Sequence, residues 1–340
     1  MVRKLRSLML FTLAASMLLL VSCGGRQSGG SLVVYAGLYE DHAIRAIETF
    51  QKETGIKVSY VRMSAGEVLE RIREEKDTPI ASVWFGGTGD TFVQAKLEGL
   101  LEPYESINAK MIDAEYKDPD NYWTGIYIGS VAFVSNKKWL QQMGLNAPQS
   151  WDDLLKPEYR GMLAMGSPLS SGTGYSVIAT LVQLFGEEKA FDYLKAFHEL
   201  KMTYTTSGSL SGRAAGNGEI GTALAFSHDA KRFYKEGFQD IVITYPKEGT
   251  GYEIGGVAII KNGPNMEEAR KFLDWSLTKQ AQELGKQVGN YQLLTNRDAI
   301  SPEEAVPLDS INVIPYDLEW AGSNRERLIN RWKDEVYKSK

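Results

Sequence analysis

The segment from Pro168 to Thr173 combines hydroxyl side chains with small residues in a way that suits an anion. It follows a predicted strand at 161–165 and opens a helix that the apolar spacing predicts over Tyr175 to Phe185. Free backbone N–H groups at a helix N-terminus attract phosphate or carboxylate groups. Simple N-capping uses only one hydroxyl, so capping alone explains the cluster poorly. We therefore expect Ser170, Ser171, Gly172 and Thr173 to contact the anionic end of a ligand.

His228 and Asp229 follow a predicted buried strand at 221–226, and Glu253 precedes another at 254–260. Together these side chains can donate to and accept from the hydroxyl groups of a sugar. The alternative is a surface His-Asp pair that caps a helix. Ser207, with Gly208 and Ser209, is a second candidate source of donors.

Two further loops follow predicted strands near the N-terminus. The first, 36–40, contributes Tyr39 and Glu40, and the second, 86–90, contributes Gly87, Thr88 and Asp90. The glycines let backbone amides approach an anion. A tight glycine turn without a ligand is the alternative for either loop.

Other chemistries find no support in the sequence. His42 and His198 lie in helix patterns without ligand-spaced partners, so we expect no metal site. A nucleophile elbow, a P-loop and a catalytic carboxylate pair are all missing, and we expect neither enzymatic activity nor a cofactor. The formal net charge of −5 argues against a nucleic-acid partner.

Alternating strand and helix patterns position these residues. Strands are predicted at 32–35, 57–63 and 81–85, with helices at 41–54 and 65–75 between them. A second run places helices at 175–185 and 188–200 and a helix-like stretch at 213–217. Such alternation indicates an α/β fold with a mostly parallel sheet.

The segment 123–135 is long, strand-rich and without a helix, and it is predicted to carry the chain from lobe one to lobe two; 254–260 is predicted to be the return strand into lobe one. Two crossovers make a hinge that suits closure around a ligand. We place lobe one at 32–126 plus 257–310 and lobe two at 127–256 plus 311–340.

The N-terminus indicates export. Residues 1–22 have a basic start and a short apolar run, as in a signal peptide. Ser22 and Cys23 end this run and resemble a bacterial lipobox, which implies that Cys23 is acylated. Cys23 is the only cysteine, so it has no partner for an internal disulfide. Residues 23–31 are then a lipid-anchored flexible tether. The alternative is a cleaved secretory signal followed by an incidental cysteine.

Several motifs resemble the family-1 solute-binding proteins of bacterial ABC importers. They are the stretches at 54–58, 148–161, 171–175 and 269–275, and the similarity spans nearly the whole mature chain. The resemblance implies a type II periplasmic-binding-protein fold, a small anionic ligand, and ABC permease and ATPase subunits as partners. The nearest branch is similar to ferric-ion, phosphonate and sugar-phosphate receptors, and in it Ser171-Gly172-Thr173 matches the anion-holding positions.

One departure from this branch bears on the ligand. Its ferric-ion receptors carry adjacent tyrosines where this chain has His228-Asp229, and no Tyr-Tyr pair occurs anywhere in the sequence. We therefore expect a monomeric, membrane-anchored extracytoplasmic receptor for a small phosphorylated anion such as a hexose phosphate. A ferric-iron receptor is the alternative; a secreted hydrolase and a surface adhesin remain further ones.

Overall fold

The computed structural model describes residues 31–338. The predicted signal peptide and Cys23 lie outside the described residues, as does nearly all of the tether. Within the described range, one mixed sheet organises the chain. Its strands are β1 (Ser31–Ala36), β2 (Lys57–Arg62), β3 (Val83–Thr88), β4 (Leu101–Glu102), β5 (Thr124–Asn136), β6 (Leu163–Gly166), β7 (Thr203–Thr205), β8 (Thr222–Phe226), β9 (Ile241–Thr244), β10 (Tyr252–Ile260) and β11 (Leu293–Leu294).

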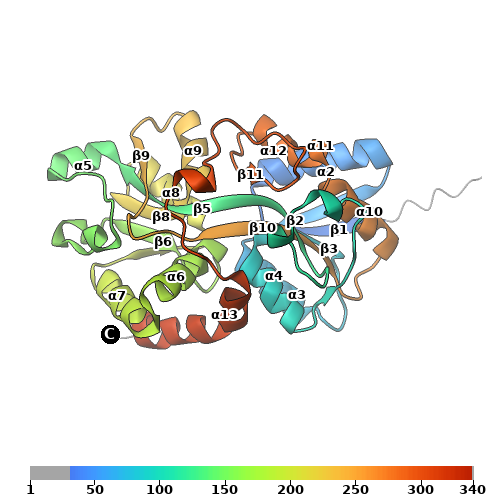
Figure 1. Cartoon of the computed structure of the whole chain (residues 1–340), viewed down its shortest axis with the longest axis horizontal. Coiled ribbons are helices and arrows are strands. Elements are labelled where there is room, and N and C mark those ends of the chain that lie inside the picture. Colours follow the sequence, from blue (N-terminus) through green and yellow to red (C-terminus); the bar gives the residue numbers. More distant parts are fainter. Residues whose placement is uncertain (1–30, 339–340) are drawn as a thin grey trace, which may run out of the picture. The chain divides into compact units, whose positions relative to one another are not determined.

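The sheet has two parallel ends joined by antiparallel strands. β2, β1 and β3 are parallel neighbours, as are β7, β6 and β8. β10 and β5 lie between these groups and pair antiparallel with each other. The first half of β5 pairs with β10, whereas its second half, from Val131, pairs with β8 and β9. β5 therefore belongs to both halves of the sheet (Figure 1).

Helices follow most of the parallel strands and cover the sheet. We call the part built on β1, β2 and β3 the first lobe and the part built on β6, β7 and β8 the second lobe. The helices are α2 (Glu40–Thr54), α3 (Ala65–Glu74), α4 (Gly89–Leu97), α5 (Lys137–Met143), α6 (Gly172–Phe185), α7 (Glu187–Glu199), α8 (Gly208–Gly216), α9 (Ser227–Lys235), α10 (Met266–Ser276), α11 (Lys279–Gln282), α12 (Leu284–Gln287) and α13 (Leu318–Trp332).

Three boundaries differ from the sequence-based expectation. β3 continues through Thr88, and α4 begins directly at Gly89, where the sequence predicted a glycine loop. α6 begins at Gly172 because the Ser171 hydroxyl caps it by accepting from the Gly174 N–H at 3.3 Å. α8 begins at Gly208, five residues before the predicted start, so Ser207 becomes its N-cap residue. All three changes move helix N-termini next to candidate ligand residues.

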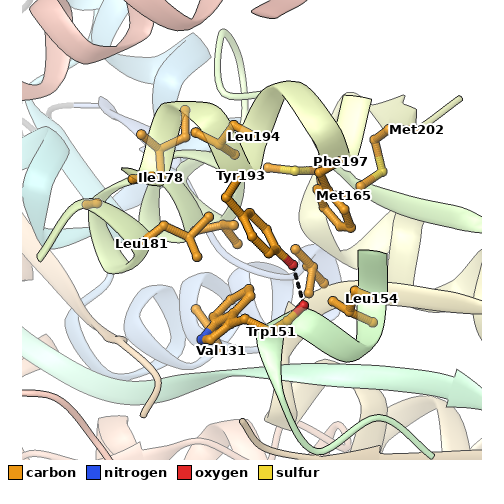
Figure 2. Packing of buried hydrophobic residues seen from close by; sticks show 14 of the residues in the cluster. Val131, Trp151, Leu154, Met165, Ile178, Leu181, Tyr193, Leu194, Phe197 and Met202 are labelled. Carbon is orange, nitrogen blue, oxygen red and sulfur yellow. Dashed lines mark hydrogen bonds between the residues drawn. The ribbon is translucent and has the colours of Figure 1, made fainter. Parts of the chain in front are cut away.

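The second lobe has a large aromatic and aliphatic core (Figure 2). α6 contributes Ile178 and Leu181, and α7 contributes Leu194 and Phe197, all of them buried. The Tyr193 hydroxyl lies in this core and donates to the Trp151 carbonyl at 2.7 Å. A buried phenol satisfied in this way fixes α7 against the segment that enters the lobe. The core is therefore a rigid base from which the loop before α6 projects.

α13 connects the two lobes. Its Leu328 and Trp332 are fully buried in the core of the second lobe. Its other face packs against α4 of the first lobe, where a Cβ added to Gly322 would overlap Val93. Helix α13 was not predicted from the sequence. Figure 1 shows α13 between α4 and α6.

Candidate functional site

A pocket lies where six helices begin. Each of the helices α2, α3, α4, α6, α8 and α9 follows the carboxyl end of a strand, and the residue that caps each N-terminus lines the pocket. In an α/β sheet, ligands bind at this edge because strand ends and helix N-termini meet there. These capping residues are Tyr39, Ser64, Thr88, Ser171, Ser207 and Phe226.

The pocket, together with the solvent space at its open side, contains about 500 Å³ that is not occupied by protein atoms. Both lobes contribute to its wall. The lining residues are Gly37, Leu38, Tyr39, Arg62, Ser64, Ala65, Gly87, Thr88, Tyr127, Ser171, Gly172, Thr173, Ser207, Gly208, Ser209, Phe226, His228, Asp229, Glu253 and Gln292.

One wall comes from the second lobe and carries the N-termini of α6 and α8. Ser171, Thr173 and Ser207 are all buried there. The Ser207 and Ser209 hydroxyl oxygens lie 3.0 Å apart and hydrogen-bond to each other. The first N–H groups of a helix lack partners within the helix, and the helix dipole adds positive potential at that end. Two such termini and four hydroxyl groups make this wall suitable for an anion.

The facing wall comes from the first lobe and brings a cation. The guanidinium of Arg62 donates from Nε to the Leu38 carbonyl at 3.2 Å. Of the residues that line the pocket, Arg62 is the only lysine or arginine. Gly87 has φ +110°, a conformation that favours glycine, and its N–H donates to the Tyr127 hydroxyl at 3.1 Å. Thr88 ends β3 and is buried beside Gly87.

Acidic side chains and a histidine form the third part of the pocket. His228 Nε2 lies 3.2 Å from Asp229 Oδ1 and 3.8 Å from Glu253 Oε1, and all three residues are at most 5% exposed. The His228 ring stacks on Phe226 with 5.5 Å between the ring centres. Burial, followed by the charges of Asp229 and Asp90, raises the pKa of Glu253 well above its ordinary value. This end of the pocket therefore offers both donors and acceptors to a polar ligand.

The lobes also touch each other around the pocket. The Gly66 N–H of α3 donates to the Ser170 carbonyl at 3.1 Å. The Ser64 hydroxyl donates to the Thr206 carbonyl at 3.3 Å. At another point an ion pair joins Arg232 of α9 to Asp41 of α2, with 2.6 Å between nitrogen and oxygen. These bonds hold segments of both lobes against the pocket.

Ten of the thirteen residues predicted to bind the ligand line this pocket, and three do not. Asp90 is buried, and its carboxylate pairs with Arg325 of α13 at 3.0 Å. The Glu40 side chain is exposed and accepts from the Tyr60 hydroxyl at 3.5 Å. Ser170 donates its hydroxyl to the Thr206 carbonyl at 3.0 Å. Each of the three is engaged with protein groups outside the pocket lining.

Four polar residues in the pocket lining were not predicted: Arg62, Ser64, Tyr127 and Gln292. Arg62 ends β2 and Ser64 follows it, at the strand edge that the other candidates share, so the same rule could have found them. Tyr127 lies within β5, and Gln292 lies in the segment before β11. No local motif marks either residue.

Two further findings concern the described residues. Within 31–338 there is no group of three or more His, Cys, Asp or Glu side chains arranged to hold a metal ion. In the same range no helix has the length and apolar character to cross a membrane.

Comparison with known proteins agrees with this architecture. Residues 85–303 match the family of bacterial extracellular solute-binding proteins. The chain belongs to this family. An uncharacterized protein of Haemophilus influenzae is 36% identical over 321 residues, which cover 92% of each chain. The Fe(3+)-binding periplasmic protein of Serratia marcescens is 25% identical over 321 residues, 92% of this chain and 93% of that protein.

A solved structure shows the same fold. It is the periplasmic binding protein AfuA from Actinobacillus pleuropneumoniae with fructose-6-phosphate bound. This chain is 38% identical to it with a TM-score of 0.89, covering 91% of this chain and 99% of that one. The predicted periplasmic-binding-protein fold is confirmed. The chain is a solute-binding protein of an ABC importer, as the relatives from Serratia marcescens and Actinobacillus pleuropneumoniae are binding proteins.

Proposed function

We propose that this receptor captures a small phosphorylated molecule, such as a hexose phosphate, and delivers it to a membrane permease. The observation that carries the proposal is the division of the pocket into two ends. The N-termini of α6 and α8, with Arg62 on the facing wall, supply positive potential, whereas His228, Asp229 and Glu253 supply hydrogen-bonding groups for a polar body. A phosphate ester of a sugar has both parts. AfuA, with fructose-6-phosphate bound, supports the same class.

The chemistry of the tyrosines argues against ferric iron as the ligand. Iron is a hard cation that phenolate oxygens suit, and Tyr39 and Tyr127 are the tyrosines in the pocket lining. Burial, followed by the charge of Asp229, raises the pKa of Tyr39 well above 10. Burial, followed by the charge of Glu253, does the same to the pKa of Tyr127. The raised pKa values make the phenolate that iron requires harder to form than in an ordinary tyrosine, whereas the protonated side chains can donate to a ligand oxygen.

The proposal assigns a role to each end of the pocket. Ser171 to Thr173, together with Ser207, hold the phosphate through amides and hydroxyls. His228, Asp229 and Glu253 bind the polar body, and Tyr39 closes from the first lobe together with Gly87 and Thr88 at the end of β3. The two lobes that close are proposed to be those expected from the sequence, 32–126 plus 257–310 and 127–256 plus 311–340.

Titration calorimetry of two variants tests this division. Losing a hydrogen bond to a charged group costs about 1.5–3 kcal/mol, or about tenfold to a hundredfold in affinity. Thr173→Val should therefore weaken sugar phosphates and inorganic phosphate alike, whereas Asp229→Ala should weaken only ligands that carry hydroxyl groups. Thr180→Val is the matched control, because Thr180 is buried in the same helix and its hydroxyl bonds the Ser176 carbonyl.

The outcomes separate the alternatives. A ligand retained through purification would appear by its own mass in native mass spectrometry. Tight binding of ferric ion without binding of any phosphate ester would overturn the proposed ligand class. Equal losses for all ligands in both variants would show that the pocket is not divided as described.

We also propose that the receptor is a monomer anchored in a bacterial membrane through acylated Cys23. The support is the lipobox-like sequence and the single cysteine. Cys23→Ala should then move the protein from the membrane fraction to the soluble extracytoplasmic fraction. A variant that still partitions into detergent as the wild type does would contradict the anchor.

A further inference from the structure

Helix α9 of the second lobe contacts the first lobe through Arg232. His228 and Asp229 lie in the first turn of this helix and line the pocket, whereas Arg232 lies one turn later and does not. Residues three and four positions apart share one face of a helix. Arg232 therefore lies on the side of α9 that carries the pocket residues.

Two contacts join Arg232 to the start of α2. The guanidinium carbon lies 4.1 Å from the centre of the Tyr39 ring, which is a cation–π contact. Arg232 Nη2 lies 2.6 Å from Asp41 Oδ2. Tyr39 is the residue before α2 and Asp41 lies in its first turn, so both contacts are made with the first lobe. We call these two contacts the latch.

The second lobe holds the other side of the Arg232 guanidinium. Nε donates to Glu236 Oε1 at 2.7 Å, at the end of α9. Nη1 is buried and has no hydrogen-bond partner among the described residues. Burying such a group is costly, and the negative face of the Tyr39 ring offsets part of the cost. If the lobes separated, Arg232 would keep Glu236 and would lose both contacts of the latch.

The latch also acts on a residue of the pocket. Tyr39 lines the pocket, and its hydroxyl oxygen is buried. Although Tyr39 belongs to the first lobe, its ring packs against an apolar cluster of the second lobe that includes Ala230 and Phe233 of α9. Arg232 covers a face of the same ring. Contacts with the second lobe therefore determine where the Tyr39 side chain lies.

A second ion pair of α9 lies at the same interface. Lys235 Nζ is 3.0 Å from Glu304 Oε1, in the segment that follows β11. This segment is bonded to the first lobe, because the Ile300 N–H donates at 2.8 Å to Glu283, which lies between α11 and α12, and α12 packs on α2. Lys235 is exposed, so the pair adds little stability but is accessible to a reagent.

We propose that Arg232 is a positioning residue that latches α9 to the start of α2 when the lobes close, and thereby holds Tyr39 in the pocket. Arg232 acts through Tyr39 and Asp41 and does not touch the ligand. This role rests on the proposed function, in which the lobes close around a ligand. It adds that part of the affinity for every ligand is determined by a contact outside the pocket lining.

Calorimetry with fructose-6-phosphate and with inorganic phosphate tests the latch. Arg232→Met keeps a long side chain and removes the charge and the planar group. The variant should weaken both ligands about tenfold, the size expected for one cation–π contact and one ion pair. Because the latch forms only in the closed molecule, the loss should appear as faster dissociation of the ligand.

Arg331 provides the matched control, because it makes the same kinds of contact inside one lobe. Its guanidinium carbon lies 4.3 Å from the centre of the Phe191 ring, and it pairs with Glu335 one turn later and with Glu188 of α7. Its side chain is 18% exposed, against 12% for Arg232. Arg331→Met should lower the melting temperature and leave the affinity for both ligands unchanged.

A change at Asp41 isolates the ion pair. The Asp41 side chain is 58% exposed, so Asp41→Asn should fold and should weaken both ligands about twofold. Adding it to Arg232→Met should cost no further affinity, because Asp41 acts through Arg232. If Arg232→Met does not fold, Arg232→Lys replaces it. Lysine keeps a charge for Asp41 but has no planar group for Tyr39, so its loss should be intermediate.

Cross-linking follows the interface without any ligand. A carbodiimide joins a lysine amine to a carboxylate that it contacts, so peptide mass spectrometry should detect an amide between Lys235 and Glu304. Arg232→Met should lower the yield of this amide, and Arg331→Met should not.

Several results would overturn the inference. They are wild-type affinity in Arg232→Met, an equal loss in Arg331→Met, a loss confined to one of the two ligands, and a further loss on adding Asp41→Asn. If the wild type binds no phosphate ester, the proposed function fails. The ligand-free cross-link then decides separately, since an equal yield in the wild type and Arg232→Met would show that Arg232 does not hold α9 to the first lobe.

Discussion

Replacing Gly172 with alanine adds one methyl group where the two lobes touch inside the pocket. Gly172 is the first residue of α6 in the second lobe, and it faces Thr88 at the end of β3 in the first. A Cβ on Gly172 would lie 2.7 Å from Thr88 Cγ2 and closer still to Thr88 Oγ1. Gly172 has no left-handed backbone, and alanine keeps the N–H group, so the substitution acts through this contact.

The size of the effect follows from the overlap. Forcing an extra methyl group into a well-packed contact costs roughly 1–3 kcal/mol. Under the proposed closure, the cost arises only when the lobes meet, because opening would separate Gly172 from Thr88. Closure and ligand binding are linked, so the apparent affinity falls by the same free energy. At about 1.4 kcal/mol per tenfold change, the expected loss is about fivefold to 150-fold for every ligand, inorganic phosphate included.

Calorimetry of the wild type and Gly172→Ala measures this loss, and thermal unfolding shows whether the fold is intact. Gly212→Ala is the control, because it adds a methyl group 3.2 Å from the Ala225 Cβ, inside the second lobe. It should lower the melting temperature without changing affinity. Gly172→Ala should lower the affinity without lowering the melting temperature. Adding Thr88→Gly to Gly172→Ala removes the overlapping atoms and should recover part of the lost affinity.

Two results would refute the reasoning. Wild-type affinity in Gly172→Ala would mean that Gly172 and Thr88 do not approach each other in the bound state. An equal loss in the double variant would mean that the alanine acts on the ligand directly. Small-angle scattering at saturating ligand adds an independent check, since Gly172→Ala should remain more extended than the wild type.

Two further predictions concern buried carboxyl groups. Asp90→Ala leaves Arg325 buried without its ionic partner, so it should lower the free energy of unfolding by about 3–5 kcal/mol in urea titrations. Adding Arg325→Met removes the unpaired charge and should recover most of the loss. Additive losses in the double variant would contradict the pairing. Because burial and the charges of Asp229 and Asp90 raise the pKa of Glu253 in the folded state, the folded protein retains a proton that the unfolded chain loses above its ordinary pKa of 4.5. The stability of the wild type relative to Glu253→Gln should therefore fall as the pH rises above 4.5, and parallel pH profiles of the two proteins would exclude this coupling.

Local patterns predicted much of the fold because the relevant forces act locally. Strand β1 and helix α2 were expected at 32–35 and 41–54 and lie at Ser31–Ala36 and Glu40–Thr54. Their apolar periods reflect which face is buried, and that pattern survives in any tertiary context. The position of the pocket followed from the same information, since the strands of an α/β sheet carry ligands at their carboxyl ends.

Long-range pairing was not predictable in this way. Asp90 has the residue type and the position of a ligand-binding residue. Its carboxylate instead pairs with Arg325, which lies 235 residues later in the sequence. Gln292 shows the converse. It follows no parallel strand and belongs to no motif, and it reaches the pocket because its segment pairs with β5 through β11. Residues that reach a site only through tertiary contacts are not marked by any regular spacing in the sequence.

The two ends of the pocket also differ in how they depend on the fold. The anion end consists mainly of backbone amides at helix N-termini, so any sequence that forms these helices supplies it. The other end depends on three side chains, those of His228, Asp229 and Glu253. Under the proposed function, substitution there should alter which polar body is bound and leave the phosphate end intact. A receptor of this construction can therefore keep its fold, its closure and its preference for anions while its ligand changes, and for that reason the ligand must be established from side-chain geometry.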